Sequence, residues 1–137
     1  MNDAVDPKYL APTAILDFAH PAVAAYGAEK TAGATTAVER AVRLYYAVRD
    51  GIWYDPYSPF YKPEHYRASR VLAAGRGYCV QKASLLGALA RGVGVPSRFT
   101  FATVRNHLAN IMQKLNFHNR VQVATLVLQH LKRTRRA

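Results

Sequence analysis

Residues 75–98 read GRGYCVQKASLLGALARGVGVPSR, and they predict a glycine turn followed by an apolar helix over about Cys79–Arg91. Three leucines of this helix are expected in the core: Leu85, Leu86 and Leu89. Gly92 and Gly94 then end the helix. The next stretch, VPSRFTFATV, alternates over Val95, Arg98 to Phe101 and Val104 in a way that is typical of a strand. This helix and strand decide the fold class.

Cys79 is the only cysteine of the chain, and it lies at the predicted start of that helix. The helix dipole and the unpaired N–H groups of a first turn lower a thiol pKa and favour the thiolate. Gly75 and Gly77 allow a sharp turn that leaves the sulfur accessible. This is the setting of a cysteine nucleophile. The alternative is a small cysteine buried as a hydrophobe, but packing alone does not explain the two glycines, Gly75 and Gly77, that precede it.

Upstream, the sequence predicts two further helices. The first begins at Pro21, a residue favoured at the first helical position, and stops by Gly33. The second begins with a capping box, Thr36 and Glu39, and runs to about Gly51. Its apolar stripe is formed by Val38, Ala41, Val42, Tyr45 and Val48.

Between the second helix and the cysteine helix lies an aromatic, proline-rich stretch. Ile52 to Tyr66 holds too many prolines for a regular helix, so we expect an ordered surface loop. Such a loop either covers the core or lines a substrate cleft. Ser69 is expected to open a short helix over Arg70 to Ala74.

Past the strand, the pattern becomes helical again. Thr103 is a suitable N-cap for a helix through Leu115, and a turn follows over Asn116 to Asn119. A last helix is predicted from about Arg120 to Leu131. The chain therefore ends in a predicted helical pair.

The net charge of +11 is unevenly distributed. Residues 1–104 hold twelve Lys and Arg against eight Asp and Glu, whereas residues 105–137 hold seven basic residues and no acidic one. An acid-free basic segment favours a polyanionic partner, although a solvated basic tail has the same composition.

Length and composition narrow the class of protein. With 137 residues, half of them hydrophobic, the chain can form one domain, or a small domain with an appendage. One cysteine excludes an internal disulfide framework and fits a reducing compartment. We see no signal peptide in MNDAVDPKYLAP and no apolar stretch of membrane-spanning length, so we expect a cytoplasmic protein without membrane contact.

The runs VRDGIWYDPY and RASRVLAAGRGYCVQKASLLGALARGVGVPSRFTFATVRNHL resemble bacterial transglutaminase-like (cysteine protease-like) proteins over most of residues 9–108. The resemblance implies a papain-like α+β fold in which Cys79 is the acyl-accepting nucleophile and its N–H helps to stabilise an oxyanion. The family completes its triad with a His and an Asp on later strands. Here the pattern is lost at about Leu108, and no acidic residue follows Glu64.

The stretch TVRNHLANIMQKLNFHNRVQVATLVL resembles the last two helices of a LuxR-type helix-turn-helix domain, over about residues 103–130. The resemblance implies that the helix from Thr103 enters a major groove of DNA. Four residues would then contact bases or phosphates: Arg105, His107, Lys114 and Arg120. The two resemblances overlap at VRNHL, so we interpret the chain as a junction of two truncated domains.

A thiol nucleophile requires an imidazole within hydrogen-bond reach. Of the five histidines, His107 is the best-placed substitute base, because it follows the strand after the cysteine helix. His20 is expected at the surface or as a helix cap, and His65 lies in the aromatic loop. No histidine pair has metal-ligand spacing with Cys79, so we expect no metal and no cofactor.

We therefore predict an α+β fold with two parts. Residues 1–102 form a truncated papain/transglutaminase-like core without its later strands, and residues 103–137 form the basic C-terminal helical pair. The predicted function is cysteine acyl transfer or peptidase-like cleavage of a peptide or amide substrate, with an incomplete triad and little turnover. The alternatives are a DNA-binding protein with weak, nonspecific affinity and a folded chimera without either activity. Self-association through the exposed edge of strand 95–101 is also expected.

Overall fold

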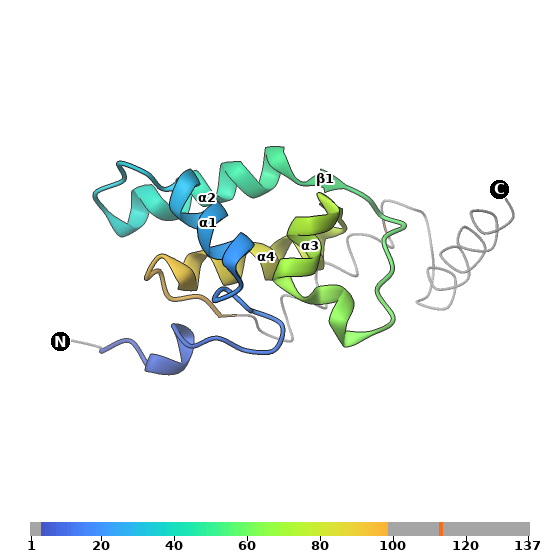
Figure 1. Ribbon diagram of the computed structural model, residues 1–137, viewed down its shortest axis with the longest axis horizontal. Helices are drawn as coiled ribbons and strands as arrows, with labels where there is room; N and C mark the ends of the chain where they lie inside the picture. Colours follow the sequence, from blue (N-terminus) through green and yellow to red (C-terminus); the bar gives the residue numbers. More distant parts are fainter. Residues whose placement is uncertain (1–3, 99–112, 114–137) are drawn as a thin grey trace, which may run out of the picture.

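The computed structural model describes residues 4–98 and Gln113. Within this part of the chain, helices surround a central helix beside a small parallel sheet (Figure 1). The elements are η1 (Pro7–Tyr9), α1 (Pro21–Lys30), α2 (Ala37–Gly51), β1 (Trp53–Tyr54), η2 (Pro63–Tyr66), α3 (Ala68–Ala74), β2 (Arg76–Gly77) and α4 (Cys79–Gly92). This mixed, helix-rich architecture agrees with the predicted fold class. The predicted C-terminal helical pair lies outside the described residues.

Local capping determines where α1 and α2 begin, as the sequence predicts. Pro21 is the first residue of α1, and the Nδ1 atom of His20 accepts the N–H of Ala22 at 3.2 Å. At α2, the Thr36 hydroxyl accepts the N–H of Glu39 at 3.1 Å, and the Glu39 carboxylate accepts the N–H of Thr36 at 3.3 Å. The predicted capping box is therefore confirmed.

The core forms around α4, which contacts α1, α2 and α3. Its Leu85 and Leu89 are fully buried together with Leu44 of α2 and Val23 of α1. The prediction for Leu85 and Leu89 is confirmed, and Leu86 is partly buried at the margin of the core. Since α4 supplies two of the four largest fully buried side chains, its position is fixed by the hydrophobic core.

The predicted apolar stripe of α2 is wrong in part, because the helix turns another face to the core. Val38, Val42 and Tyr45 are 72%, 47% and 52% exposed, whereas Leu44 and Val48 are buried. Leu44 and Val48 are four residues apart and therefore lie one above the other, on the side facing α4. Of the predicted stripe, Val48 is confirmed as a core residue, whereas the other buried residue of α2, Leu44, was not predicted.

Helix α3 starts at Ala68, one residue before the predicted cap Ser69. The Ser69 side chain does not cap this helix. Instead, the Ser69 N–H donates to Oδ1 of Asp17 at 3.0 Å, so the cap comes from a residue distant in sequence. At the other end, Gly75 has φ +64° and closes α3 in the left-handed conformation.

The loop over Ile52 to Tyr66 is largely irregular, as predicted, and it contains two short elements that the sequence did not reveal. They are the turn η2 and the strand β1, which pairs in parallel with β2 so that Trp53 lies opposite Arg76 and Tyr54 opposite Gly77. This pairing joins the end of α2 to the residues before Cys79. The aromatic loop is thereby held against the start of α4.

The predicted strand is absent from the portion that the structure describes, Val95–Arg98. The Val95 N–H donates back to the carbonyl of Ala90 in α4, Pro96 has no N–H, and the Ser97 N–H donates to the carbonyl of Tyr9. These amides are therefore used by the helix end and the N-terminal segment rather than by a ladder. Residues 99–104 of the predicted strand lie outside the described part, and self-association through its edge stays a prediction.

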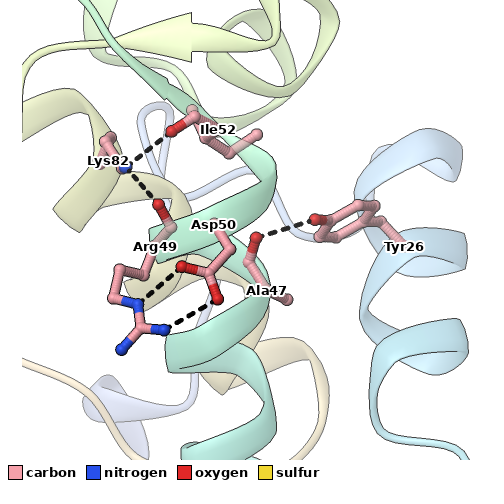
Figure 2. A network of polar contacts seen from close by, with 6 residues as sticks. All are labelled: Tyr26, Ala47, Arg49, Asp50, Ile52 and Lys82. Carbon is pink, nitrogen blue, oxygen red and sulfur yellow. Dashed lines mark hydrogen bonds and ion pairs between the residues drawn. The ribbon is translucent and has the colours of Figure 1, made fainter.

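The C-terminal end of α2 is held by a side chain from α4 (Figure 2). The Nζ atom of Lys82 donates to the carbonyl of Arg49, in the last turn of α2, at 3.0 Å and to that of the C-cap residue Ile52 at 2.6 Å. On the other side, the Tyr26 hydroxyl of α1 donates to the carbonyl of Ala47 at 3.3 Å.

Within residues 4–98, no helix combines the length and apolar character that crossing a bilayer requires.

Candidate active site

Cys79 is the first residue of α4 and is partly exposed, which confirms its predicted place at a helix N-terminus. The two nearby glycines have different roles. Gly75 supplies the left-handed turn that brings the chain out of α3. Gly77 is needed for space, because a Cβ atom there would lie 3.0 Å from both Cβ and Oε1 of Gln81. The approach to Cys79 is thus a turn followed by a tightly packed, extended segment.

Gln81 fastens the first turn of α4 to the aromatic loop. Its Oε1 accepts the N–H of Tyr78 at 3.1 Å, and its Nε2 donates to the carbonyls of Pro59 at 2.7 Å and His65 at 3.0 Å. The side chain is 4% exposed. A buried amide with three hydrogen bonds to backbone groups fixes the residues on either side of Cys79.

A chain of phenols extends this attachment. The Tyr78 hydroxyl donates to the Tyr66 hydroxyl at 2.8 Å, and the Tyr66 hydroxyl donates to the carbonyl of Phe60 at 2.7 Å. Burial, followed by the hydrogen bond to Tyr66, raises the pKa of Tyr78 far above its usual value. Tyr78 therefore stays a neutral hydrogen-bond donor and is not a proton acceptor for the thiol at physiological pH.

Two other side chains share the surroundings of Cys79. Burial raises the pKa of Tyr54, and a negative charge on Cys79 raises it further. Lys82 follows Cys79 by three residues and lies on the same face of α4. Burial lowers the Lys82 pKa, and Asp50 partly opposes that effect. Its Nζ is held by the carbonyls of Arg49 and Ile52 at the end of α2.

The structure describes one of the predicted site residues, Cys79. The predicted base His107 and the predicted nucleic-acid contacts lie outside the described part: Arg105, His107, Lys114 and Arg120. His65 is confirmed in the aromatic loop, where its Nδ1 accepts the N–H of Lys62 at 3.2 Å. Among residues 4–98, no three His, Cys, Asp or Glu side chains form a group able to hold a metal ion.

Sequence reasoning missed three residues that shape the site: Tyr54, Gln81 and Lys82. Gln81 left a partial signal, because a Gln at the third helical position is half of a capping box. Tyr54 and Lys82 left none, since their roles depend on β1 and on the end of α2. These partners are brought to α4 only by the tertiary fold.

Comparison with known protein families gives one match. The family model of the transglutaminase-like superfamily matches residues 24–129, which is more than half of the chain and includes Cys79 and the whole of α4. No protein with curated annotation and no solved structure matches the sequence.

Proposed function

This chain belongs to the transglutaminase-like superfamily, and we propose that it is a cysteine acyl-transfer or peptidase-like domain in which Cys79 is the nucleophile. The observation that supports this most is the place of Cys79 as the first residue of α4. There the first-turn N–H groups and the helix dipole favour the thiolate. As the family resemblance implies, the N–H of Cys79 would help to stabilise the oxyanion of the tetrahedral intermediate.

The proposed reaction uses the thiolate as a covalent catalyst. The sulfur attacks the carbonyl carbon of an amide or ester, and the negative charge moves to the carbonyl oxygen. The tetrahedral intermediate then collapses, so that the C–N or C–O bond breaks and a thioester forms on Cys79. The leaving amine or alcohol takes a proton, and water or an amine cleaves the thioester in the second step.

Proton transfer is the weak point of this site. We propose His107 as the base, and the 137 residues provide no acidic side chain after Glu64 to orient it. An imidazole without an orienting partner is a poor general base. We therefore propose that residues 1–102 form the acyl-accepting domain and that its turnover is slow or absent.

Intact mass spectrometry after incubation with p-nitrophenyl acetate tests this proposal. We expect one acetyl group per chain, located on Cys79, with slow or no release of acetate. Cys79→Ala should abolish the adduct, and His20→Ala, which alters a histidine that caps α1, should leave it unchanged. Absence of an adduct, without hydrolysis of the ester, would refute the proposal that Cys79 is a nucleophile. Fast hydrolysis that is lost in both Cys79→Ala and His107→Ala would refute the incomplete triad.

A second candidate function, DNA binding, rests on the charge distribution. Seven Lys and Arg and no acidic residue lie in residues 105–137. Like the last helices of a LuxR-type domain, this segment would contact DNA through Arg105, His107, Lys114 and Arg120. Without the rest of such a domain to set the angle of the helix, we propose contacts to phosphates rather than to bases.

Fluorescence anisotropy with a labelled duplex, over a range of salt concentrations, tests this second candidate. We expect weak binding that falls steeply with salt and is equal for scrambled duplexes. Deleting residues 132–136 should weaken binding to every duplex alike. Preference for one sequence by orders of magnitude at physiological salt would contradict nonspecific binding, and absence of binding at low salt would refute the function.

A further inference from the structure

A cavity of about 320 Å³ lies between α3, β2, the start of α4 and the aromatic loop. Gln81, Arg76 and Asp55 contribute to its walls, whereas Cys79 and Tyr54 do not. Alternation along the paired strands explains this separation, because Arg76 and Asp55 point to one side of the sheet and Tyr54 to the other. The cavity is therefore distinct from the surroundings of the thiol.

Two buried polar groups line the cavity and have unused hydrogen-bonding capacity. Ser58 is 5% exposed, and its hydroxyl makes no hydrogen bond with any described residue. His65 is 8% exposed, and its Nδ1 is occupied by the N–H of Lys62, so the neutral ring carries its proton on Nε2. That Nε2–H also has no partner among residues 4–98. Both side chains therefore present a polar group to the cavity that a ligand can use.

Two guanidinium groups add positive charge to the cavity wall. Arg70 is paired with Glu64 at 3.3 Å, whereas Arg76 forms no ion pair within the described part of the chain. Asp55 is the acidic residue of the wall, and its Oδ1 accepts the N–H of Tyr57 at 2.9 Å. Since Glu64 offsets the charge of Arg70, and Asp55 offsets that of Arg76, the surroundings of the cavity are close to neutral. A neutral wall disfavours a phosphate dianion more than it disfavours a monoanion.

We propose that this cavity binds a carboxylate, held by Arg76 and by the hydroxyl of Ser58 and the Nε2–H of His65. A guanidinium presents two parallel N–H groups in the geometry that a carboxylate accepts. The carboxylate comes from a peptide, either from its C-terminus or from an acidic side chain, and Gln81 lies in the same wall. The occupied cavity therefore adjoins the residue that fixes the first turn of the cysteine helix.

NMR titration of the full chain with small carboxylates tests the proposal. The probes are N-acetylglycine, which represents a peptide C-terminus, and N-acetylglutamate with its α-carboxyl group blocked as the methylamide, which represents an acidic side chain. We expect saturable shifts of the His65 ring and the Arg76 Nε–H with at least one probe. The tighter probe identifies the source of the carboxylate. Absence of saturable shifts with both would overturn the proposal.

Matched variants distinguish specific binding in the cavity from nonspecific attraction of the anion to a positively charged surface. Arg76→Ala should lower the affinity for the tighter-binding probe by about tenfold, and Ser58→Ala should lower it by a smaller factor. Arg49→Ala removes the same charge from α2, outside the cavity, and should leave binding unchanged. Equal weakening by Arg76→Ala and Arg49→Ala would overturn the proposal, as would tighter binding of inorganic phosphate than of either carboxylate. Because Arg76 is exposed, its replacement leaves the core intact.

Discussion

At the scale of single residues, Gln81 connects the first turn of α4 to the aromatic loop. The Gln81 amide connects the N–H of Tyr78 to the carbonyls of Pro59 and His65. Position 77 has room for glycine but not for a larger residue, because a Cβ atom there would lie 3.0 Å from the Gln81 side chain. The backbone that leads to Cys79 is thus held by one buried polar side chain.

Replacing Gln81 by Leu should therefore destabilise the fold. The change keeps the approximate volume and leaves one buried N–H and two carbonyls without their partner, which costs about 2–4 kcal/mol of unfolding free energy. Urea denaturation measures the loss. Val38→Ala, at a position that is 72% exposed, is the control and should change the stability little. An equal stability of Gln81→Leu and wild type would show that the amide is not needed.

Residue-level predictions succeeded where the partners are close in sequence. The cap by His20, the capping box of Thr36 and Glu39, and the start of α4 at Cys79 all depend on bonds across two or three positions. The predicted cap Ser69 failed, because the cap comes from Asp17. A bond that spans fifty-two positions leaves no local pattern.

At the scale of elements, α2 shows how periodicity can indicate a helix and mistake its buried face. Leu44 and Val48 face α4, and the row with Val38 and Val42 remains in solvent. Both rows have helical spacing, so the choice between them depends on which neighbour is present. The sequence predicts the helix, and the tertiary contact with α4 selects the face.

A pair of alanine substitutions in α2 distinguishes the two faces. Leu44→Ala should cost about 2–5 kcal/mol, because it removes a fully buried side chain and leaves a cavity. Val42→Ala should cost less than about 1 kcal/mol, because Val42 is 47% exposed. Thermal and urea unfolding of both variants measures the difference. A larger loss of stability for Val42→Ala than for Leu44→Ala would show that the face predicted from periodicity is the buried one.

The short elements β1 and β2 could not be predicted. Each has two residues, and their pairing in parallel depends on the return of the chain through the aromatic loop and α3. Conversely, the alternating residues from Val95 predicted a strand, and Val95–Arg98 has none, because Val95 and Ser97 donate to α4 and to the N-terminal segment. An alternating pattern of apolar and polar residues concerns only the side chains. A strand also requires backbone N–H groups that can bond to a neighbouring strand.

At the scale of the whole molecule, α4 unites the described residues. Its first turn is attached to the aromatic loop through Gln81, and its middle forms the core. Near its end, the Arg91 guanidinium donates to the carbonyls of Ala11 at 2.6 Å and Ser97 at 2.8 Å. The place of Cys79 at the start of α4 and the buried leucines of this helix were predictable, because both are properties of one continuous stretch of sequence.

Global stability should fall as the pH is lowered from about 7 to 5, in part through His65. Burial, aided by Arg70 and Lys62 and opposed by Glu64, lowers the His65 pKa below its usual 6.5. The unfolded chain therefore binds a proton more readily than the native one, so stability is retained above the unfolded pKa and lost as the pH falls through the folded pKa.

Urea denaturation at pH 7.5 and 5.5 measures this effect. His65→Asn keeps an acceptor for the Lys62 N–H and should show a smaller loss between the two pH values than the wild type. His20→Asn, which alters an exposed helix cap, should keep the loss of the wild type. An identical pH dependence in all three proteins would exclude His65 as its source.

The central claim is that Cys79 is an activated nucleophile, and the rate of its alkylation by iodoacetamide as a function of pH tests this most directly. Because Cys79 is the only cysteine, every adduct reports on this thiol. We expect native protein to react with a midpoint below about 8.5, the value of a free cysteine, and the urea-unfolded chain to react with the ordinary midpoint. A native rate that rises only near the pKa of a free thiol, or a native protein that is not labelled, would contradict the claim.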